Sequence, residues 1–399
     1  MNYTRVHLDS LGYELPPVVV TSEELETRLS PMYEKLHIQP GQLEALTGIT
    51  ERRWWEEGYA VSEGAAAAAR KALEQSNVEA KDLEVVIYAG VCRENFEPAT
   101  ACAVADLIGA NPDAYIYDIS NACLGVMNGI IDIANRIELK QIKAGMVVSC
   151  ESSRDINEVM IQRMLQENSM ECFTRSLATL TGGSGAAAVL LTDGSFAKRS
   201  NRRLLGAVTK AAPQHHRLCR WGVNLTPVGL TKLMFSPDKL KMAVEDIFKP
   251  ETIPSALKDI MTSELLPGAI QKMLPSQKLP AMLTQFMTTD SVAVLKHGVE
   301  LGIRTWGAFL GKLGWAREQV DKIICHQVGS GHRATVLREL GITPEKEYPT
   351  FPYLGNMGTV SLPMTAALAE QRGFLKPGDR VGFLGIGSGL NCLMLGWEW

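Results

Sequence analysis

The sequence lacks the features that would place the protein in a membrane, outside the cell or on a nucleic acid. Its 399 residues contain no apolar run near the roughly 20 residues that span a bilayer. The N-terminal stretch MNYTRVHLDSLGYEL does not show the charged-then-apolar pattern of a signal peptide. The net charge is -4, and acidic and basic residues are mixed rather than gathered in a basic block. We therefore expect a cytoplasmic protein that binds no nucleic acid.

The eight cysteines also lack the spacings of metal sites and redox motifs. No CxxC occurs, and no group of Cys and His residues has zinc-finger spacing. In a chain of this size inside a cell, thiols usually stay reduced. We therefore expect no metal, and most of the cysteines should be small buried apolar residues.

Apolar strand-like runs alternate with helical runs along the first half of the chain. Because the strand-like runs are continuously apolar, they predict a sheet that is covered on both faces. The predicted strands are 83–90, 115–119, 144–150 and 184–192, and the predicted helices are 99–108 and 124–139. This pattern indicates an α/β fold.

The second half repeats the rhythm, which suggests a pseudo-duplicated fold with halves 1–200 and 201–399. Between the repeats, a segment at about 226–287 is rich in Pro, Met, Leu and Lys and predicts short amphipathic helices inserted in the second half. The predicted helices here are 291–313, 332–340 and 361–372, and the predicted strands are 320–327, 380–386 and 392–397.

One cysteine, Cys123, stands at a corner between a predicted strand and a predicted helix, in YIYDISNACLGVMNG. It could serve packing, redox chemistry, metal binding or nucleophilic catalysis. The unpaired N–H groups at a helix N-terminus favour a thiolate, lower the thiol pKa and can hold an oxyanion. A strand-to-helix corner also faces the edge of the sheet where open α/β folds keep their sites. These features favour acyl transfer through a thioester.

Three later motifs offer partners for this cysteine. His326 ends an apolar strand in IICHQVGSGH, and Asn356 lies in a Gly-flanked loop in FPYLGNMGTVSLP. A Gly-rich turn, LGIGSGLNC, allows close approach of backbone to a ligand. Taken singly, a histidine of this kind is more often structural and such an asparagine is usually a turn residue.

In their order along the chain, NAC, HQ, GNxG and GxGSG resemble the thiolase superfamily and, within it, the ketoacyl-synthase III group. The resemblance implies a thiolase-like, pseudo-duplicated five-layer α-β-α-β-α fold and an acyltransferase that acts through Cys123, His326 and Asn356. It also implies an oxyanion site made by the N–H groups of Cys123 and Ser388. No cofactor is implied.

The string RENFEPAT, with LTGITERRWW, SNACLGVMNG and LTGGSGAAAVLL, resembles the OleA family of head-to-head acyl-condensing enzymes of bacterial olefin biosynthesis. That resemblance implies non-decarboxylating Claisen condensation of two long-chain fatty acyl-CoA substrates to a 2-alkyl-3-ketoacyl product. It also implies a homodimer in which Glu97 of one subunit is the base for the other. Glu94 is expected to be a solvated loop acid.

The chain departs from acetyl-CoA-using ketoacyl-synthase III enzymes at one point, because Leu46 stands before Thr47 where they carry an arginine that clamps the CoA adenine. Arg52 and Arg53 are candidate substrate-binding residues in its place, although surface packing is the simpler expectation. Further candidates for contact with substrate are Gly387 and Gly389 in the Gly-rich turn.

Other functions remain open from the sequence alone. A decarboxylating, carrier-protein-dependent synthase or a ketosynthase that joins two carrier-bound chains would keep the same Cys, His and Asn. An inactive partner subunit would usually lose the cysteine or the histidine.

The segment at about 226–287 is most simply a packed helical subdomain. It could instead dock on a membrane surface, cover an acyl tunnel or bind a downstream biosynthetic enzyme.

Overall fold

The computed structural model describes residues 1–196, 202–225 and 283–399. They divide into two compact units, Met1–Arg220 with Thr288–Trp399 and Trp221–Met287. The first unit contains residues from both predicted halves, so the boundary near residue 200 stays a prediction. The predicted helical insertion lies mostly outside the described residues.

In the first part of the chain every predicted strand and helix is present, and further strands and helices that were not predicted lie before residue 75 and between residues 154 and 180. The 3-10 helices are marked η. The elements are β1 (His7–Glu14), β2 (Val18–Thr21), α1 (Ser22–Arg28), α2 (Ser30–Leu36), α3 (Gln42–Thr47), β3 (Glu51–Trp54), α4 (Val61–Glu74), η1 (Ala80–Asp82), β4 (Val85–Ala89), α5 (Thr100–Ile108), β5 (Tyr115–Ile119), η2 (Ala122–Leu124), α6 (Gly125–Glu138), β6 (Ala144–Glu151), α7 (Arg154–Glu167), α8 (Met170–Leu180) and β7 (Gly185–Thr192).

The remaining described elements repeat the same alternation. They are β8 (Arg203–Ala211), η3 (Pro213–His215), β9 (Cys219–Leu225), β10 (Leu283–Thr289), α13 (Ser291–Leu313), η6 (Arg317–Gln319), β11 (Lys322–Cys325), α14 (Ser330–Leu340), η7 (Pro344–Lys346), α15 (Phe351–Leu354), η8 (Gly358–Val360), α16 (Ser361–Gln371), β12 (Arg380–Gly387) and β13 (Asn391–Glu398). In the second unit β9 pairs with β10, and Trp221 Nε1 donates a hydrogen bond to Gln285 Oε1 at 3.2 Å.

A nine-stranded sheet in the order β11-β12-β13-β8-β1-β7-β6-β4-β5 runs through the first unit. The pairs β4–β5, β4–β6 and β11–β12 are parallel, whereas β6–β7, β1–β7, β12–β13 and β13–β8 are antiparallel. The strands of the two sequence halves meet where His7 of β1 pairs with Arg203 of β8. The sheet is therefore mixed.

The continuous apolar strands are buried on both faces, as their sequences predict. Every residue of β4, β6 and β7 is buried. Side chains alternate between two cores along such a strand, so Val85 and Ile87 enter one hydrophobic cluster while Val86 and Tyr88 enter another. Each of these strands thus links two layers of the fold.

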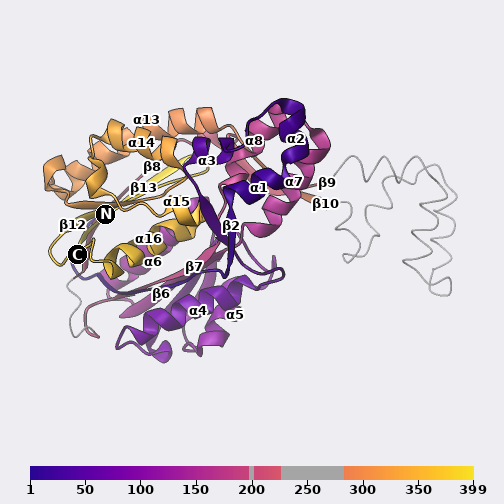
Figure 1. Cartoon of the computed structure of the whole chain (residues 1–399). Helices are drawn as coiled ribbons and strands as arrows, with labels where there is room; N and C mark the ends of the chain where they lie inside the picture. Colours follow the sequence, from indigo (N-terminus) through magenta and orange to yellow (C-terminus); the bar gives the residue numbers. More distant parts are fainter. Residues whose placement is uncertain (197–201, 226–282) are drawn as a thin grey trace, which may run out of the picture. The chain divides into compact units, whose positions relative to one another are not determined.

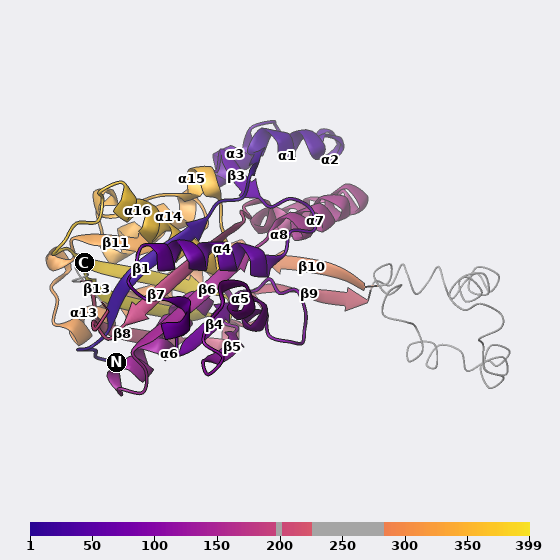
Figure 2. The same cartoon turned by 90° about the horizontal axis from the view of Figure 1, so that it is seen from below.

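Three hydrophobic clusters define five layers, which are stacked from bottom to top in Figure 1. Helices α4 and α5 cover one side of the strands β1, β7, β6, β4 and β5, as Figure 2 shows from below. Helices α6 and α16 fill the middle between those strands and the strands β11, β12, β13 and β8. Helices α13 and α14 cover the outer side of the second set of strands. The predicted thiolase-like five-layer fold class is confirmed.

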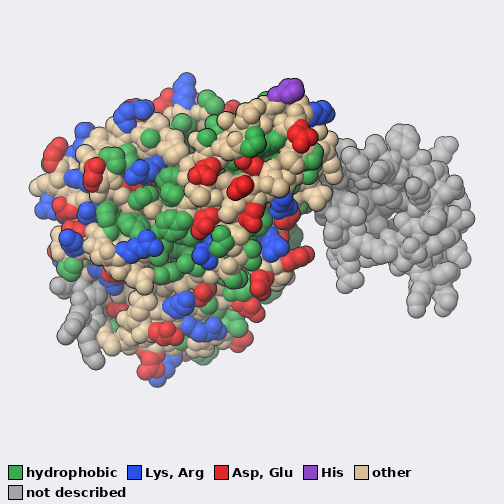
Figure 3. All heavy atoms as spheres, in the orientation of Figure 1, with side chains coloured by type: hydrophobic (Ala, Val, Ile, Leu, Met, Phe, Trp, Pro, Cys, Tyr) green, Lys and Arg blue, Asp and Glu red, His purple; other side chains and the backbone are tan. Residues whose placement is uncertain are grey.

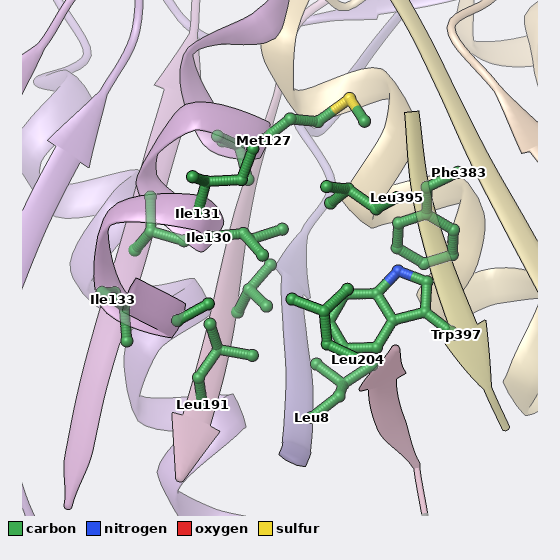
Figure 4. Close-up of a cluster of buried hydrophobic side chains, with 14 of the residues drawn as sticks. Leu8, Met127, Ile130, Ile131, Ile133, Leu191, Leu204, Phe383, Leu395 and Trp397 are labelled. Carbon is green, nitrogen blue, oxygen red and sulfur yellow. The ribbon is translucent and has the colours of Figure 1, made fainter. Parts of the chain in front are cut away.

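Large apolar side chains fill the core between the middle layer and the strands on either side of it. Ile130 of α6, Leu395 and Trp397 of β13 and Leu8 of β1 are 0% exposed. Figure 4 shows them pointing toward one another between the helix and the strands. Burying a side chain of this size contributes roughly 1.5–3 kcal/mol relative to leaving it in water. This packing fixes α6, and with it the corner that carries Cys123.

On the face seen in Figure 3, Lys and Arg side chains lie among Asp and Glu side chains, and hydrophobic side chains gather over α15 and α16. Within the described residues, none of the helices combines the length and apolar character that crossing a membrane would require.

Candidate active site

Cys123 lies in a tight corner between β5 and α6. The cysteine is the middle residue of η2, a single 3-10 turn, and α6 begins two residues later at Gly125. Ala122, just before the cysteine, has φ 45°, a left-handed conformation that costs about 1–2 kcal/mol for a residue with a Cβ. The corner is therefore sharper than the direct strand-to-helix junction that the sequence predicts.

The thiol of Cys123 is less acidic than the sequence suggests. Cys123 is partly buried, and desolvation is the main cause that raises its pKa to about 12, with further contributions from Cys219 and the carboxylate of Glu151. The predicted lowering of this pKa is wrong for the unliganded site. A 3-10 turn offers a weaker positive end than a long helix, and a buried carboxylate lies close enough to oppose ionisation.

The Gly-rich turn between β12 and β13 packs directly against this corner. A Cβ added to Gly387 would lie 3.1 Å from Leu124 Cγ and 3.5 Å from the backbone N of Cys123. Asn391, after the turn, donates from Nδ2 to Asn121 Oδ1 at 3.1 Å. Gly387 is thus beside Cys123, and Ser388 and Gly389 lie in the same turn.

His326 follows β11 and lies next to β12. Its backbone N–H donates to Leu384 O at 2.9 Å, three residues before Gly387, and the residue is 5% exposed. Its Nδ1 is buried and has no hydrogen-bond partner among the described residues. Desolvation, with a smaller contribution from His332, lowers the pKa of His326 to about 3. The imidazole is therefore neutral at physiological pH.

Asn356 is held by its backbone in the loop between α15 and η8. Its N–H donates to Thr181 O at 2.8 Å, and its carbonyl accepts from Gly183 N at 2.9 Å. Its side-chain Oδ1 accepts from Gly358 N at 3.1 Å, so the Nδ2 end of the amide is the donor available to a ligand.

Two residues that sequence analysis did not single out connect these segments. Thr359 Oγ1 accepts the N–H of Val126 at 2.8 Å, which joins the Asn356 loop to the first turn of α6. Gln327, adjacent to His326, donates to Tyr348 O at 2.7 Å and accepts from Thr350 N at 2.7 Å. The HQ motif was a visible signal for Gln327, whereas Thr359 shows its role only in the fold.

The structure therefore brings together the segments of Cys123, Asn356 and Gly387 by direct contacts, and places His326 beside the strand that leads to Gly387. These residues come from both sequence halves. A partly buried thiol, a neutral imidazole and a carboxamide form a donor and acceptor set suited to acyl transfer.

Glu97 is separate from this cluster within its own chain. It lies on the exposed loop between β4 and α5, where its neighbour Phe96 is fully exposed, at 104%. Glu94, on the same loop, is more than a solvated acid. Its Oε1 accepts hydrogen bonds from the backbone N of Ser62 at 2.8 Å and from Ser62 Oγ at 2.6 Å, and thereby caps the start of α4.

Arg52 has a structural environment that its sequence position does not suggest. It is 0% exposed, and its guanidinium donates to Ser22 Oγ at 3.0 Å, which leaves no surface for a substrate phosphate. The expectation of surface packing is also wrong for Arg52, because alternate residues of β3 face inward. Arg53 is partly buried, and its Nη1 donates to Pro16 O at 3.2 Å.

Among the residues that the structure describes, no group of three or more His, Cys, Asp and Glu side chains is arranged to hold a metal ion.

Comparison with known proteins places the chain in a family. Residues 310–399 match the model for the C-terminal part of 3-oxoacyl-[acyl-carrier-protein (ACP)] synthase III. The acyl-CoA:acyl-CoA alkyltransferase of Shewanella oneidensis is 53% identical over 401 residues, with 100% of both chains covered. The chain belongs to the acyl-CoA:acyl-CoA alkyltransferase family. The alkyltransferase of Xanthomonas campestris is 30% identical, again over 100% of both chains.

Solved structures of alkyltransferase family members agree with this assignment. Crystal structures of Xanthomonas campestris OleA superpose with a TM-score of 0.82 at 30% identity and cover 100% of this chain and 98% of theirs. They include variants substituted at a cysteine, a glutamate and a histidine, and a cysteine variant with bound lauric acid and lauroyl-CoA. The predicted superfamily, the OleA resemblance and the acyltransferase class are confirmed.

Proposed function

We propose that this alkyltransferase joins two long-chain fatty acyl-CoA molecules head to head, without decarboxylation, through an acyl-enzyme on Cys123. The observation that carries the proposal is the cluster of Cys123, Asn356 and the Gly387 turn in a chain 53% identical to an acyl-CoA:acyl-CoA alkyltransferase. The lauroyl-CoA bound to a cysteine variant of the Xanthomonas enzyme supports acyl-CoA as the substrate. The reaction as proposed requires no cofactor.

In the first step, the sulfur of Cys123 attacks the thioester carbonyl and CoA leaves as a thiol. Because the unliganded thiol has a pKa of about 12, its proton must be accepted as the carbon–sulfur bond forms. We assign this role to His326, whose imidazole is neutral and can take a proton. The backbone N–H groups of Cys123 and Ser388 hold the oxyanion.

In the second step, Glu97 of the partner subunit removes the α-proton of a second acyl-CoA. His326 and Asn356 donate hydrogen bonds to the enolate oxygen. The carbanion attacks the Cys123 thioester, the carbon–sulfur bond breaks, and a 2-alkyl-3-ketoacyl-CoA leaves. The proton that Glu97 removed balances the one that the Cys123 sulfur takes up, so the carboxylate and the thiol are both restored. Two covalent steps replace one difficult bond formation.

Supply of Glu97 by a partner subunit is supported by its exposure and by its position in the sequence. In the Xanthomonas enzyme, the substituted glutamate precedes the substituted cysteine by 26 positions, which is also the separation of Glu97 and Cys123. A carboxylate placed within hydrogen-bond reach of the α-proton can act as the general base for this step. The proposal therefore includes a homodimer.

The 53% identity to an alkyltransferase favours this reaction over a decarboxylating synthase that extends with malonyl groups. Such an enzyme needs no strong base, because loss of CO₂ makes its carbanion.

The test separates the two steps with Glu97→Gln, a variant of nearly the same shape that cannot accept the proton. Acylation of Cys123 by myristoyl-CoA, followed by intact-protein mass spectrometry, should continue at the wild-type rate. Formation of the condensed product should fall by roughly 10²–10⁴-fold, the range for loss of a general base. Normal condensation by Glu97→Gln would refute the assignment of Glu97.

A further inference from the structure

The loop that carries Glu97 is fixed at its first residues by a buried carboxylate. Glu151 ends β6 and is 5% exposed. Its Oε1 accepts the N–H of Val91 at 2.9 Å, and its Oε2 accepts the N–H of Cys92 at 3.0 Å. The fully buried Tyr88 adds a third contact, because its hydroxyl donates to Cys92 O at 2.6 Å.

A second carboxylate fixes the other end of the same loop. Asp118, in β5, accepts the N–H of Thr100 on Oδ2 at 3.0 Å and the N–H of Ala101 on Oδ1 at 2.9 Å. Its side chain is 9% exposed, and Arg93 lies 3.9 Å from it. The first turn of α5 is therefore capped by a strand residue rather than by its own N-cap, Ala99.

Between these two anchors the loop is exposed. Residues 93–98 are all exposed in this chain, with Phe96 and Glu97 among them. The loop thus has two fixed ends and a projecting tip. A base that must meet an α-proton in another subunit needs this combination, because a displacement of about 1 Å in a reacting group can cost roughly 10²-fold in rate.

We propose that Glu151 and Asp118 are positioning residues that hold the Glu97 loop by its two ends and so set the base for the partner's active site. The inference rests on the proposed function, since it takes Glu97 as the base. Each carboxylate accepts two N–H donors, and a Gln or Asn side chain would turn an NH₂ group toward one of them. Buried N–H donors left unpaired disfavour the native loop conformation.

Glu151 also lies against the active site of its own subunit. A Cβ on Gly358 would lie 3.4 Å from Glu151 Cγ, and Gly358 is hydrogen-bonded to Asn356. Loss of activity in Glu151→Gln therefore has two explanations. The variant either misplaces the base that its subunit lends or damages the thiol site that its subunit keeps.

Mixed dimers distinguish these explanations. Two differently tagged variants are co-expressed, and the heterodimer that carries both tags is assayed for condensation of myristoyl-CoA. Glu151→Gln paired with Cys123→Ala should regain the activity of one intact site, because the Cys123→Ala subunit lends a correctly held Glu97. Condensation by Glu151→Gln paired with Glu97→Gln should stay roughly 10- to 100-fold below that of one intact site, as expected for a misplaced base.

The reverse pattern, with recovery in the pair with Glu97→Gln and none in the pair with Cys123→Ala, would overturn the inference. Asp118→Asn should behave as Glu151→Gln does, and recovery with Cys123→Ala itself shows that either variant folds. If Cys123→Ala paired with Glu97→Gln recovers no activity, lending of the base between subunits is wrong, and the proposed function fails before the inference does.

The chain offers a matched control for the chemistry of the substitution. Glu138 Oε2 accepts two backbone N–H groups, from Thr4 at 2.9 Å and from Arg5 at 3.0 Å, but it holds the N-terminal arm instead of the Glu97 loop. Glu138→Gln should leave condensation and acylation at the wild-type rate in every pairing. A loss of condensation equal to that of Glu151→Gln would assign the effect to general destabilisation.

Discussion

At the residue scale, the thiol of Cys123 is protonated before substrate binds. Its pKa of about 12 means that the thiolate fraction grows about tenfold for each pH unit through the neutral and mildly alkaline range. The rate of Cys123 alkylation by iodoacetamide should therefore keep rising from pH 7 to pH 10. Peptide mapping separates Cys123 from the exposed Cys102. A plateau below pH 9 would show that the site favours the thiolate.

The neutral state of His326 makes stability depend on pH. Burial holds its folded pKa at about 3, against 6.5 unfolded, so the unfolded chain binds more protons between these values and stability falls as pH drops below 6.5. Between pH 7.5 and pH 5, the free energy of unfolding of His326→Asn, measured by urea denaturation, should fall by less than that of the wild type. The difference between the two losses should be roughly 1–2 kcal/mol. Equal losses in both proteins would contradict a buried neutral imidazole.

Sequence motifs were sufficient to propose Cys123, His326 and Asn356, because each stands at the end of a strand or in a Gly-flanked loop. They did not point to Glu151, Asp118 or Thr359, whose partners lie 17 to 233 positions away along the chain. Such contacts are set by sheet order, which residue spacing does not encode.

At the element scale, β5 and α13 have the predicted bounds, Tyr115–Ile119 and Ser291–Leu313. Both have strong apolar periodicity and clear ends. In contrast, β1 lies at the centre of the sheet but was not predicted, because its letters HLDSLGYE include polar residues. Ser10 is buried there because its hydroxyl donates to Ala72 O at 2.7 Å. This tertiary hydrogen bond satisfies the Ser10 hydroxyl within the core.

The close packing of β12 on the Cys123 corner gives a test at this scale. A Cβ at Gly385 would lie 2.3 Å from Met127 Sδ and 2.5 Å from Leu124 Cδ2, whereas at Gly382 the nearest atom is 3.4 Å away. Gly385→Ala should therefore lower the free energy of unfolding by roughly 1–3 kcal/mol, the cost of overpacking. It should also slow acylation of Cys123.

Gly382→Ala, on the same strand, is the control and should change both quantities little. Urea denaturation and the acyl-enzyme burst measure the two effects. Equal behaviour of the two variants would mean that the contact between β12 and α6 does not hold the corner.

At the scale of the whole molecule, the alternation of apolar runs predicted a sheet with helices on both faces, since strands apolar on both faces need cover on both sides. The five layers were implied by the resemblance to the thiolase superfamily. The function of segment 226–287 was not predictable in the same way. In the Xanthomonas enzyme, the substituted cysteine and histidine are 142 positions apart, whereas Cys123 and His326 are separated by 203 positions. The difference is close to the length of this segment, which supports its assignment as an insertion.

We expect the catalytic unit to function without this insertion. Replacing residues 226–282 with a short Gly-Ser turn between β9 and β10 should leave the melting temperature and the acylation of Cys123 by myristoyl-CoA close to wild type. Liposome co-sedimentation and the chain-length preference of the shortened protein then test the membrane and tunnel roles predicted for the segment. A shortened chain that cannot be acylated would place the segment within the active site.

The most direct test of the proposed reaction supplies the purified protein with myristoyl-CoA as its sole substrate and follows products by mass spectrometry. A myristoyl adduct should form on the Cys123 peptide, followed by a β-keto product that contains both chains, and Cys123→Ala should give neither species. A joined product that forms only when a malonyl donor is added, or that persists in Cys123→Ala, would contradict the proposed reaction.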